Sequence, residues 1–448
     1  MKHLPVSNPN VLWLSLALAS VVACGKTVNQ LEGGPGLSAN KQNQAQGADA
    51  EGQTVGQEGT DPATAAAGVP GIPGVALSSA PVPDTATIAK LIASDFAKNG
   101  GNSPSVIYAT IDHLAPQKVD SAKLEIVRFG MAKVLNSVSM APAIVKLQAV
   151  DEAKTVFRIN LADFKQAAAL GRIKSAQYAE GNVSQVGGAT VVKGDWLVYA
   201  LSRPEVYDPL MNLPALDRQL ESTLGVNYSK AAYINVASGT SDVVFAGRVL
   251  MRVPIEIGGK PGGYYWRSYD FVRADVQNRA FTDPSTLKNA QISDLVAGEF
   301  FFSLPNGLQA YYLVGFGNQH RYDVPAPGGG SIDPPVATDY RRPQDGLTRC
   351  VGGKPGCGFV INGESCMTCH GTGVNIPKTP AGTNGISLAD MTTLINQDRA
   401  RFGGAIKEMG YDTAIDEPIF ATLNIFRSDR KVADKRVQGS EISGITGR

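Results

Sequence analysis

The sequence predicts an α+β fold with N-terminal helices, a mixed or antiparallel sheet region, and a small, mostly helical C-terminal segment. Apolar residues recur at helical spacing near both ends of the foldable part, in residues 84–101 and 387–402. Apolar and polar residues alternate in residues 154–161, as in a half-buried strand. Between them, residues that favour strands dominate three runs: 242–257, 264–272 and 298–316.

Each predicted helix carries an apolar stripe. The first helix ends at a Gly-Gly pair, and its stripe consists of Ile88, Leu91, Ile92 and Phe96. The second, in residues 120–138, has the stripe Leu124, Val127, Met131, Val134 and Leu135. A leucine stripe in residues 213–225 stops at Gly225. The last helix opens with Ser387 and Asp390, which have the spacing of a capping box.

The aromatic runs in the middle of the chain are expected to form sheet core rather than a binding surface. Two of them are separated by Pro305-Asn306-Gly307, a three-residue hairpin signal with glycine where a left-handed conformation is needed. Nucleic acid is not an expected partner, because the 448 residues carry a formal net charge of only +1.

The N-terminus predicts export. Lys2 precedes an apolar run from Val11 to Ala23, which has the length of a signal h-region and is too short to span a bilayer comfortably. The string Val-Val-Ala-Cys that ends at Cys24 resembles the bacterial lipobox, which implies a lipid on Cys24. The alternative is an ordinary signal peptide with an incidental cysteine. The residue directly after Cys24 is Gly25, which resembles the pattern of outer-membrane lipoproteins.

Two cysteines and a histidine stand together as Cys366-Met-Thr-Cys369-His370, in a chain with five cysteines and four histidines. This spacing is that of c-type haem attachment. Thiols at i and i+3 lie on one helical turn and can add to the two porphyrin vinyl groups, and the adjacent histidine supplies the proximal iron ligand. The motif therefore predicts one covalent haem c, bound through Cys366, Cys369 and His370.

Two other uses of the cysteines stay open. Together with Cys350 and Cys357, the motif residues could supply four tetrahedral zinc ligands, although the interval from Cys350 to Cys357 is wide for a zinc knuckle. A thioredoxin-like dithiol would need a βαβ unit, which the Gly/Pro-rich approach to the motif does not provide. If haem takes the motif, Cys350 and Cys357 most simply form a disulfide in an oxidising compartment.

The string CMTCHGTG resembles the haem peptide of monohaem cytochromes c, in which His-Gly often follows as in His370-Gly371. The strings YYWRSYDF, FFFSLPNGLQAYYL and VINGESCMTCH are similar to a group of exported bacterial proteins with one such motif after a long non-haem region. That likeness covers residues 105–375. It implies a cytochrome c function for Cys366, Cys369 and His370 and identifies no substrate.

The distal iron ligand is less determined by the sequence. Met409 lies in a predicted loop of the kind from which small cytochromes c present methionine, so it is the leading candidate. Met391, His320 and His113 are further candidates. The remaining possibility is that the sixth position of the iron is open. Met391 falls on the apolar face of a predicted helix, and His113 suits a satisfied structural role better.

The expected organisation has five segments. They are a signal peptide at 1–23, a lipid-anchored flexible linker at 24–84, an α+β domain of unknown role at 85–325, a Pro/Gly-rich linker at 326–349, and a haem c-binding region with a basic tail at 350–448. The linker at 24–84 is nearly free of aromatic residues and cannot bury enough apolar surface to order itself. The tail from Arg427 to Arg448 is expected to be a solvated surface or a frayed end.

These features predict an exported lipoprotein of the cell envelope, in the outer membrane and facing the periplasm or the cell surface. Its expected role is one-electron transfer to a redox partner protein, with membrane attachment through the lipid and with no catalytic residues. One alternative is a haem enzyme or sensor with an open, peroxidase-like site. Another is a zinc-stabilised interaction lipoprotein without redox function.

Overall fold

The computed structural model describes residues 80–99, 103–114, 121–214, 217–237, 247–271, 295–315, 362–376, 380–410 and 417–430. All of them belong to one compact unit, residues 67–448. The predictions for the signal peptide, Cys24, the linker at 326–349, His320, Cys350 and Cys357 concern residues outside these ranges, as does the linker at 24–84 except for its last residues, 80–84. Among the helices within them, none combines the length and apolar character needed to cross a membrane.

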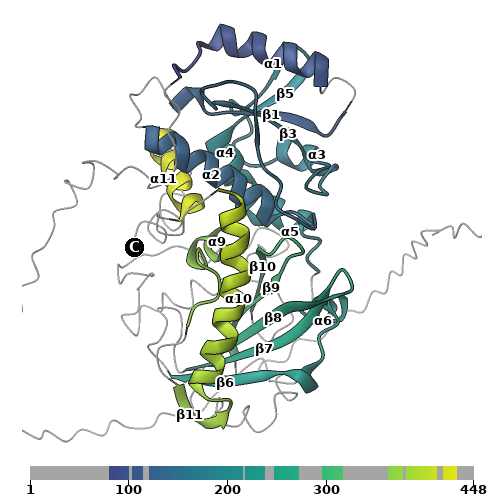
Figure 1. Ribbon diagram of the computed structural model, residues 1–448, viewed down its shortest axis with the longest axis vertical. Helices are drawn as coiled ribbons and strands as arrows, with labels where there is room; N and C mark the ends of the chain where they lie inside the picture. The colour runs from purple at the N-terminus through teal and green to yellow at the C-terminus, as the bar shows by residue number, and fades with distance from the viewer. Residues whose placement is uncertain are drawn as a thin grey trace, which may run out of the picture. The chain divides into compact units, whose positions relative to one another are not determined.

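Two sheets and several helices make a mixed α+β fold, as the sequence predicts (Figure 1). The first sheet has the order β2-β3-β1-β5-β4, in which β1 runs parallel to β5 and antiparallel to β3. Its strands are β1 (Val106–Thr110), β2 (Gln148–Ala149), β3 (Val156–Asn160), β4 (Val183–Val186) and β5 (Ala189–Lys193).

Helices cover both faces of this five-stranded sheet. One face packs against α1 (Thr85–Asn99), and the other faces α2 (Ser121–Ser137) and α4 (Gly194–Ser202). Strand β1 shows why: Val106 and Tyr108 belong to the core under α1, whereas Ile107 and Ala109 belong to the larger core on the opposite face. Shorter elements connect these parts: η1 (Asp112–Leu114), α3 (Ala169–Lys174) and α5 (Pro204–Leu210).

The second sheet is antiparallel throughout and has the order β10-β9-β8-β7-β6-β11. Its strands are β6 (Ala232–Ala237), β7 (Gly247–Ile257), β8 (Lys260–Phe271), β9 (Leu295–Ser303), β10 (Gln309–Gly315) and β11 (Pro380–Gly385), and η2 (Tyr228–Lys230) precedes β6. The hairpin predicted at Pro305-Asn306-Gly307 joins β9 to β10. Gly307 has φ +92°, the left-handed conformation that the turn requires.

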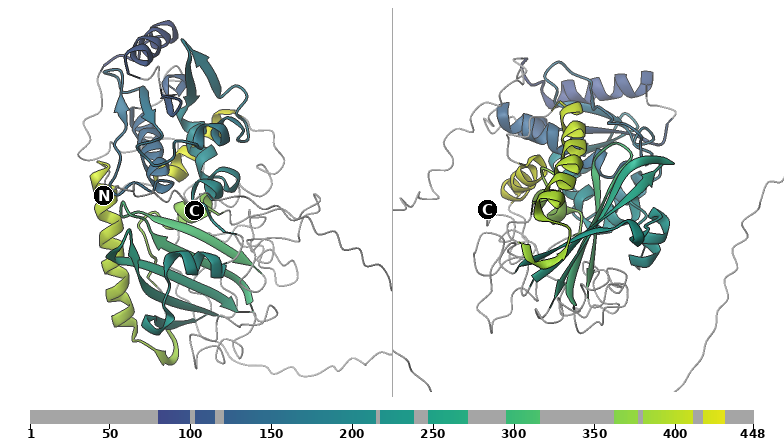
Figure 2. Two further views of the ribbon diagram at one scale, coloured as in Figure 1. Left: turned by 90° about the vertical axis from the view of Figure 1, so that its right-hand side faces the viewer. Right: turned by 60° about the horizontal axis from the view of Figure 1, so that its bottom comes forward.

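The chain after the predicted 326–349 linker shares the core of the chain before it. Strand β11 pairs with β6, and the long helix α10 (Leu388–Glu408) runs along the second sheet (Figure 2). The final helix, α11 (Pro418–Arg430), packs against α2 and α4. The capping box at the start of α10 is confirmed, because the Ser387 hydroxyl accepts a hydrogen bond from the Asp390 backbone N–H at 3.0 Å.

The prediction of a solvated tail from Arg427 onward is wrong at its first residues. Arg427 lies in α11 and is 5% exposed. The apolar residues Ile419, Leu423 and Phe426 recur at helical spacing and are fully buried, so this segment is a core helix. This apolar stripe is visible in the sequence, but the basic residues that follow it favour a solvated tail and led to the wrong prediction.

A row of four paired residues crosses the second sheet on the face that α10 covers. Arg252 on β7 pairs with Trp266 on β8, Trp266 with Phe301 on β9, and Phe301 with Tyr311 on β10. Asp398 of α10 binds two members of this row, accepting from the Arg252 guanidinium twice and from the Trp266 indole, each at 2.8 Å. These bonds hold α10 to the sheet.

The opposite face of the same sheet carries a buried charge cluster around Arg267. This guanidinium contacts Glu221 and, at 3.2 Å, Asp217, both from α6 (Asp217–Leu224). It also contacts the Tyr228 hydroxyl and lies 4.8 Å above the Phe300 ring. Asp217 and Glu221 therefore share one buried cation, Arg267.

Candidate functional site

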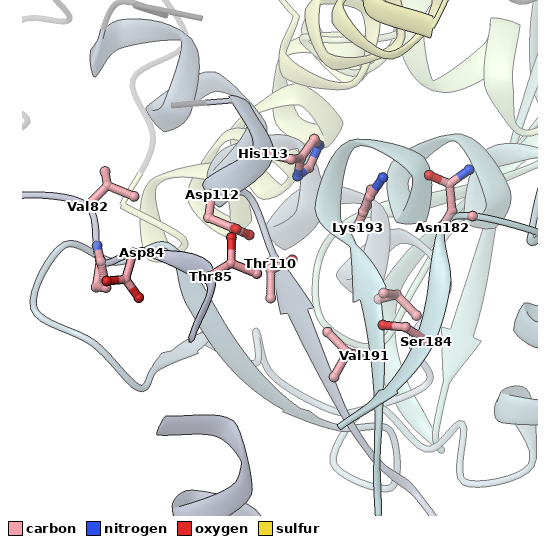
Figure 3. A pocket seen from close by; sticks show the side chains of 13 residues that line it. Val82, Asp84, Thr85, Thr110, Asp112, His113, Asn182, Ser184, Val191 and Lys193 are labelled. Atoms are coloured by element: carbon pink, nitrogen blue, oxygen red, sulfur yellow. The ribbon is translucent and has the colours of Figure 1, made fainter. Parts of the chain in front are cut away.

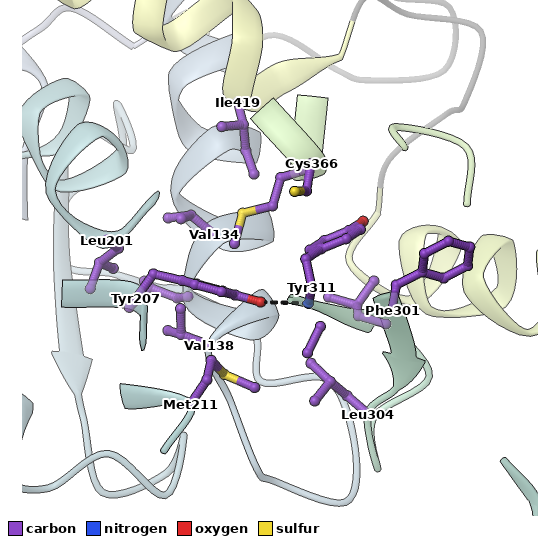
Figure 4. Packing of buried hydrophobic residues seen from close by; sticks show 14 of the residues in the cluster. Val134, Val138, Leu201, Tyr207, Met211, Phe301, Leu304, Tyr311, Cys366 and Ile419 are labelled. Carbon is purple, nitrogen blue, oxygen red and sulfur yellow. Dashed lines mark hydrogen bonds between the residues drawn. The ribbon is translucent and has the colours of Figure 1, made fainter. Parts of the chain in front are cut away.

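The Cys-x-x-Cys-His motif forms one turn of helix inside the core. Helix α9 spans Glu364–Cys369, and the backbone N–H of His370 donates to the Cys366 carbonyl at 2.9 Å, so His370 continues the turn. Cys366 is 5% exposed and His370 9% exposed. Figure 4 shows Cys366 among Val134, Tyr207, Tyr311 and Ile419. Of Cys369, only the backbone is described, and it lies three residues after Cys366 on the same turn.

One hydrogen bond orients the imidazole of His370. Its Nδ1 lies 3.2 Å from the carbonyl oxygen of Gly373. A carbonyl oxygen only accepts, so Nδ1 carries a hydrogen in this contact. A metal-binding histidine needs this tautomer, with the second nitrogen donating to a backbone carbonyl. The donor set of the motif thus fits an iron ligand at Nε2.

The second sheet provides the seat for His370. The centroid of the His370 ring is 5.0 Å from that of Phe301 and 5.7 Å from that of Tyr311. These two residues are paired across β9 and β10 in the row described above. Because the strands set their spacing, the imidazole rests on a rigid surface rather than on a loop.

Strand β10 is an edge strand, and α5 covers its edge at the site. The backbone N–H of Tyr311 donates to the Tyr207 hydroxyl at 2.8 Å (Figure 4). The Tyr311 hydroxyl in turn accepts from Gln309 at 2.9 Å. Burial raises the pKa of Tyr311 well above its usual value, so its hydroxyl stays neutral beside Cys366.

The entry into α9 depends on Asn362 and Gly363. The Asn362 amide donates to Asp208 at 2.8 Å, which ties the segment to α5. Gly363 has φ +80°, and a Cβ added there would lie 2.6 Å from the carbonyl oxygen of Ser202 and 2.9 Å from the Tyr207 ring. Position 363 therefore accepts glycine alone without backbone movement.

A buried ion cluster begins the motif helix. Glu364 is 0% exposed, and its two carboxylate oxygens accept from Arg427 at 2.6 Å and from Arg203 at 3.2 Å. Burial opposes ionisation of Glu364, but the two guanidinium groups outweigh it and lower its pKa below the ordinary value of 4.5. Sequence spacing gave no signal for this cluster, because its partners lie 161 and 63 residues away in the chain.

The depressed pKa of Glu364 predicts a loss of stability in acid. A carboxylate whose pKa is lower in the folded state stabilises above its unfolded pKa and loses that contribution as pH falls through the folded value. We expect Glu364→Gln to lower the free energy of unfolding at neutral pH, and the gap from wild type to narrow below pH 4.5. Urea unfolding of both proteins from neutral pH to below pH 4.5 measures this difference in the free energy of unfolding. The control is Glu205→Gln, a carboxylate 45% exposed and 3.9 Å from Arg203, for which only a small difference at neutral pH is expected.

The other ligand candidates have different surroundings. Met409 ends α10 and is partly buried against the core, and Met391, near the start of the same helix, is fully buried. The Nε2 atom of His113 lies 2.9 Å from the buried carboxylate of Asp195. This contact gives His113 a structural partner, as its sequence context suggested.

His113 also lines a polar pocket where the parallel strands β1 and β5 end (Figure 3). The pocket has a volume of about 720 Å³, and Asp84, Asp112, Asn182 and Lys193 contribute polar groups to its wall. None of the lining residues belongs to the Cys-x-x-Cys-His motif. Sequence reasoning did not find this pocket, because it joins residues from the start of α1 to the end of β5.

Within the described ranges, no three histidine, cysteine, aspartate or glutamate side chains are grouped as metal ligands. Cys350 and Cys357, which the zinc alternative requires, lie outside those ranges. Comparison with known proteins finds no matching family model, no matching curated protein and no matching solved structure.

Proposed function

We propose that the chain is an exported bacterial lipoprotein with a cytochrome c-like C-terminal segment that carries one covalent haem c and acts in one-electron transfer. Cys366 and Cys369 would hold the haem through thioethers, and His370 would be the proximal ligand. The observation that supports this most is the Nδ1 contact with the Gly373 carbonyl, the backbone contact that metal-binding histidines commonly make with their second ring nitrogen. The lipid on Cys24 and the outer-membrane location belong to the same proposal.

When bound, haem supplies an iron that gains and loses one electron. The chain supplies the rest. The helical turn sets the spacing of the two thiols, the pair Phe301 and Tyr311 supports the imidazole, and the buried side chains around Cys366 exclude water. A redox partner protein would exchange the electron. On the distal side, Met409 remains the first candidate.

Full-length protein made with a cytochrome c maturation system tests the proposal. We expect a pyridine haemochrome spectrum of c-type haem, with one haem per chain that stays attached after denaturation. Cys366→Ser removes one thioether, so the haem should be lost or its spectrum should shift to that of a single attachment. Cys350→Ser is the matched control, because a cysteine outside the motif should leave the haem in place.

Two outcomes would contradict the proposal. Protein without haem but with one zinc per chain, lost in Cys350→Ser, would support the zinc alternative. Haem that binds added cyanide or carbon monoxide readily would indicate an open site and favour an enzyme or sensor. An unchanged low-spin spectrum after both additions supports the electron carrier.

A further inference from the structure

The polar pocket at the ends of β1 and β5 lies on the same face of the first sheet as the core under α1. On this face Tyr108 and Val191 are paired and buried in that core. Two residues further along the strands, Thr110 is paired with Lys193, and the Lys193 backbone N–H donates to the Asn182 carbonyl at 3.0 Å. Since residues two apart on a strand face the same side, the apolar core ends in a polar row of these three residues. All three line the pocket (Figure 3).

The segment that leads into α1 and the turn after β1 complete the wall. Asp84 lines the pocket at the start of α1, and Asp112 lines it from η1. The Asp84 carboxylate accepts from the Thr87 backbone N–H at 2.7 Å, so it already serves as the cap of α1. In Figure 3, Asp112 lies on one side of Lys193 and Asn182 on the other. The wall thus presents a carboxylate, an ammonium group and an amide in that order.

Two acceptors in this wall have no donor within the described part of the chain. Asn182 is 4% exposed, and its Nδ2 donates to the Tyr178 carbonyl at 2.7 Å, but its buried Oδ1 has no hydrogen-bond partner. In Figure 3 this oxygen points toward Lys193. The Asp112 carboxylate is half-buried and makes no hydrogen bond or ion pair with the chain there. Because an acceptor taken out of water without a donor is costly, both positions suit donor groups of a ligand.

The charged groups of the wall favour a ligand that carries both signs of charge. Lys193 is the one lysine or arginine among the lining residues, and Asp84 and Asp112 are the two acids. His113 also lines the pocket, but its Nε2 lies 2.9 Å from the buried carboxylate of Asp195. A simple anion would meet two carboxylates, and a simple amine would meet an ammonium group. A molecule with an ammonium and a carboxylate can place each beside the opposite charge.

The remaining lining residues favour a small, non-aromatic ligand. Among the described residues that line the pocket, no Phe, Tyr or Trp offers a ring on which a nucleobase could stack. Val82, Val191 and Val192 supply aliphatic contacts instead. The volume of about 720 Å³ lies in the range of small-molecule sites and is ample for a compound of amino-acid size.

We propose that this pocket binds a small zwitterion of the α-amino-acid class. Asp112 accepts from the ammonium group of the ligand, and Lys193 faces its carboxylate. The Oδ1 atom of Asn182 accepts from a donor on the ligand's side chain. The site is separate from the Cys-x-x-Cys-His motif, none of whose residues lines the pocket.

Saturation-transfer difference NMR on the full-length protein tests the proposal, with an equimolar mixture of the twenty common L-amino acids as the probe. We expect signals from one or a few amino acids whose side chains carry an N–H or O–H donor. Calorimetric titration of each of these gives its Kd. The N-acetyl derivative lacks the ammonium group and the carboxamide lacks the carboxylate, so each should bind about 10-fold more weakly or worse.

Three variants in the wall identify the groups that bind. Asp112→Asn keeps the shape of the side chain and should weaken binding about 10-fold or more. Lys193→Gln should do the same, and it leaves the start of α4 intact because the Lys193 side chain makes no cap hydrogen bond there. Asn182→Ala should reduce the preference for side chains with a donor. If this buried substitution prevents folding, the first two variants still decide the outcome.

Asp163→Asn is the matched control. Asp163 is a carboxylate outside the pocket lining that accepts from the Asn160 amide at 2.9 Å. We expect this variant to bind the same amino acids with the wild-type Kd. Urea unfolding of every variant separates loss of binding from loss of fold.

Binding that is weakened in Asp112→Asn and Lys193→Gln but not in Asp163→Asn supports the proposal. No signal from the mixture, or equal binding by all the folded variants, overturns it. Equal binding of the N-acetyl derivative, or of inorganic phosphate, would show a site for anions and overturn it too. Haem content has no part in these measurements, so the proposed function and this site can fail independently.

Discussion

Replacing Arg267 with methionine is expected to lower the free energy of unfolding by about 3–5 kcal/mol. The substitution leaves the carboxylates of Asp217 and Glu221 inside the protein without their cation. Methionine fills much of the volume above Phe300, so the loss reports on charge more than on packing. Urea denaturation should show a lower midpoint with an unchanged slope.

Arg158→Met is the matched control for Arg267→Met. Arg158 pairs with Asp95, but both side chains are partly exposed, and water can solvate the carboxylate that remains. We expect a loss of about 1 kcal/mol or less. Equal losses in the two variants would show that burial of the Arg267 cluster does not increase its contribution to the free energy of unfolding.

The second large effect is expected for Gly363→Ala. A residue with a side chain at φ +80° and ψ −73° costs about 1–3 kcal/mol, and the close approach to Ser202 and Tyr207 forces a backbone shift that costs about 1–3 kcal/mol more. Since Gly363 leads directly into α9, we also expect reduced haem incorporation. Thermal unfolding and haem content measure the two effects.

Gly403→Ala is the control for this substitution. Gly403 lies within α10, and a Cβ added there meets nothing within 4 Å. An alanine in a helix interior is more favourable than glycine, so this variant should be more stable by up to about 1 kcal/mol. If Gly363→Ala behaves like Gly403→Ala, the conformation at position 363 does not limit the motif helix.

The elements that the sequence predicts correctly are those determined by residues close together in the chain. The first two helices, strand β3 and the β9–β10 hairpin follow from apolar spacing and turn chemistry within a few residues. The leucine stripe at 213–225 corresponds to the shorter helix α6, and residues 215–216 lie outside the described ranges. The helical turn that carries Cys366 and Cys369 was likewise predictable from local spacing, because only four residues determine it.

The surroundings of that turn were not predictable in this way. The seat of His370 combines β9 with β10, and the ion cluster combines α5, α9 and α11. No repeat or spacing links Arg203 to Glu364, because only the packing of the core brings them together. The sequence shows that a charged residue, Glu364, lies next to the motif. It does not show which residues pair with it.

The position of Arg427 has a consequence for the order of events during synthesis. The chain is made from its N-terminus, so Glu364 emerges 63 residues before the arginine that completes its cluster. At typical rates of synthesis this interval lasts roughly 3 to 13 s. During it, α9 lacks α11, which packs against it in the finished protein. The Cys366 thiol therefore has a period of access to other molecules that ends when α11 packs against α9.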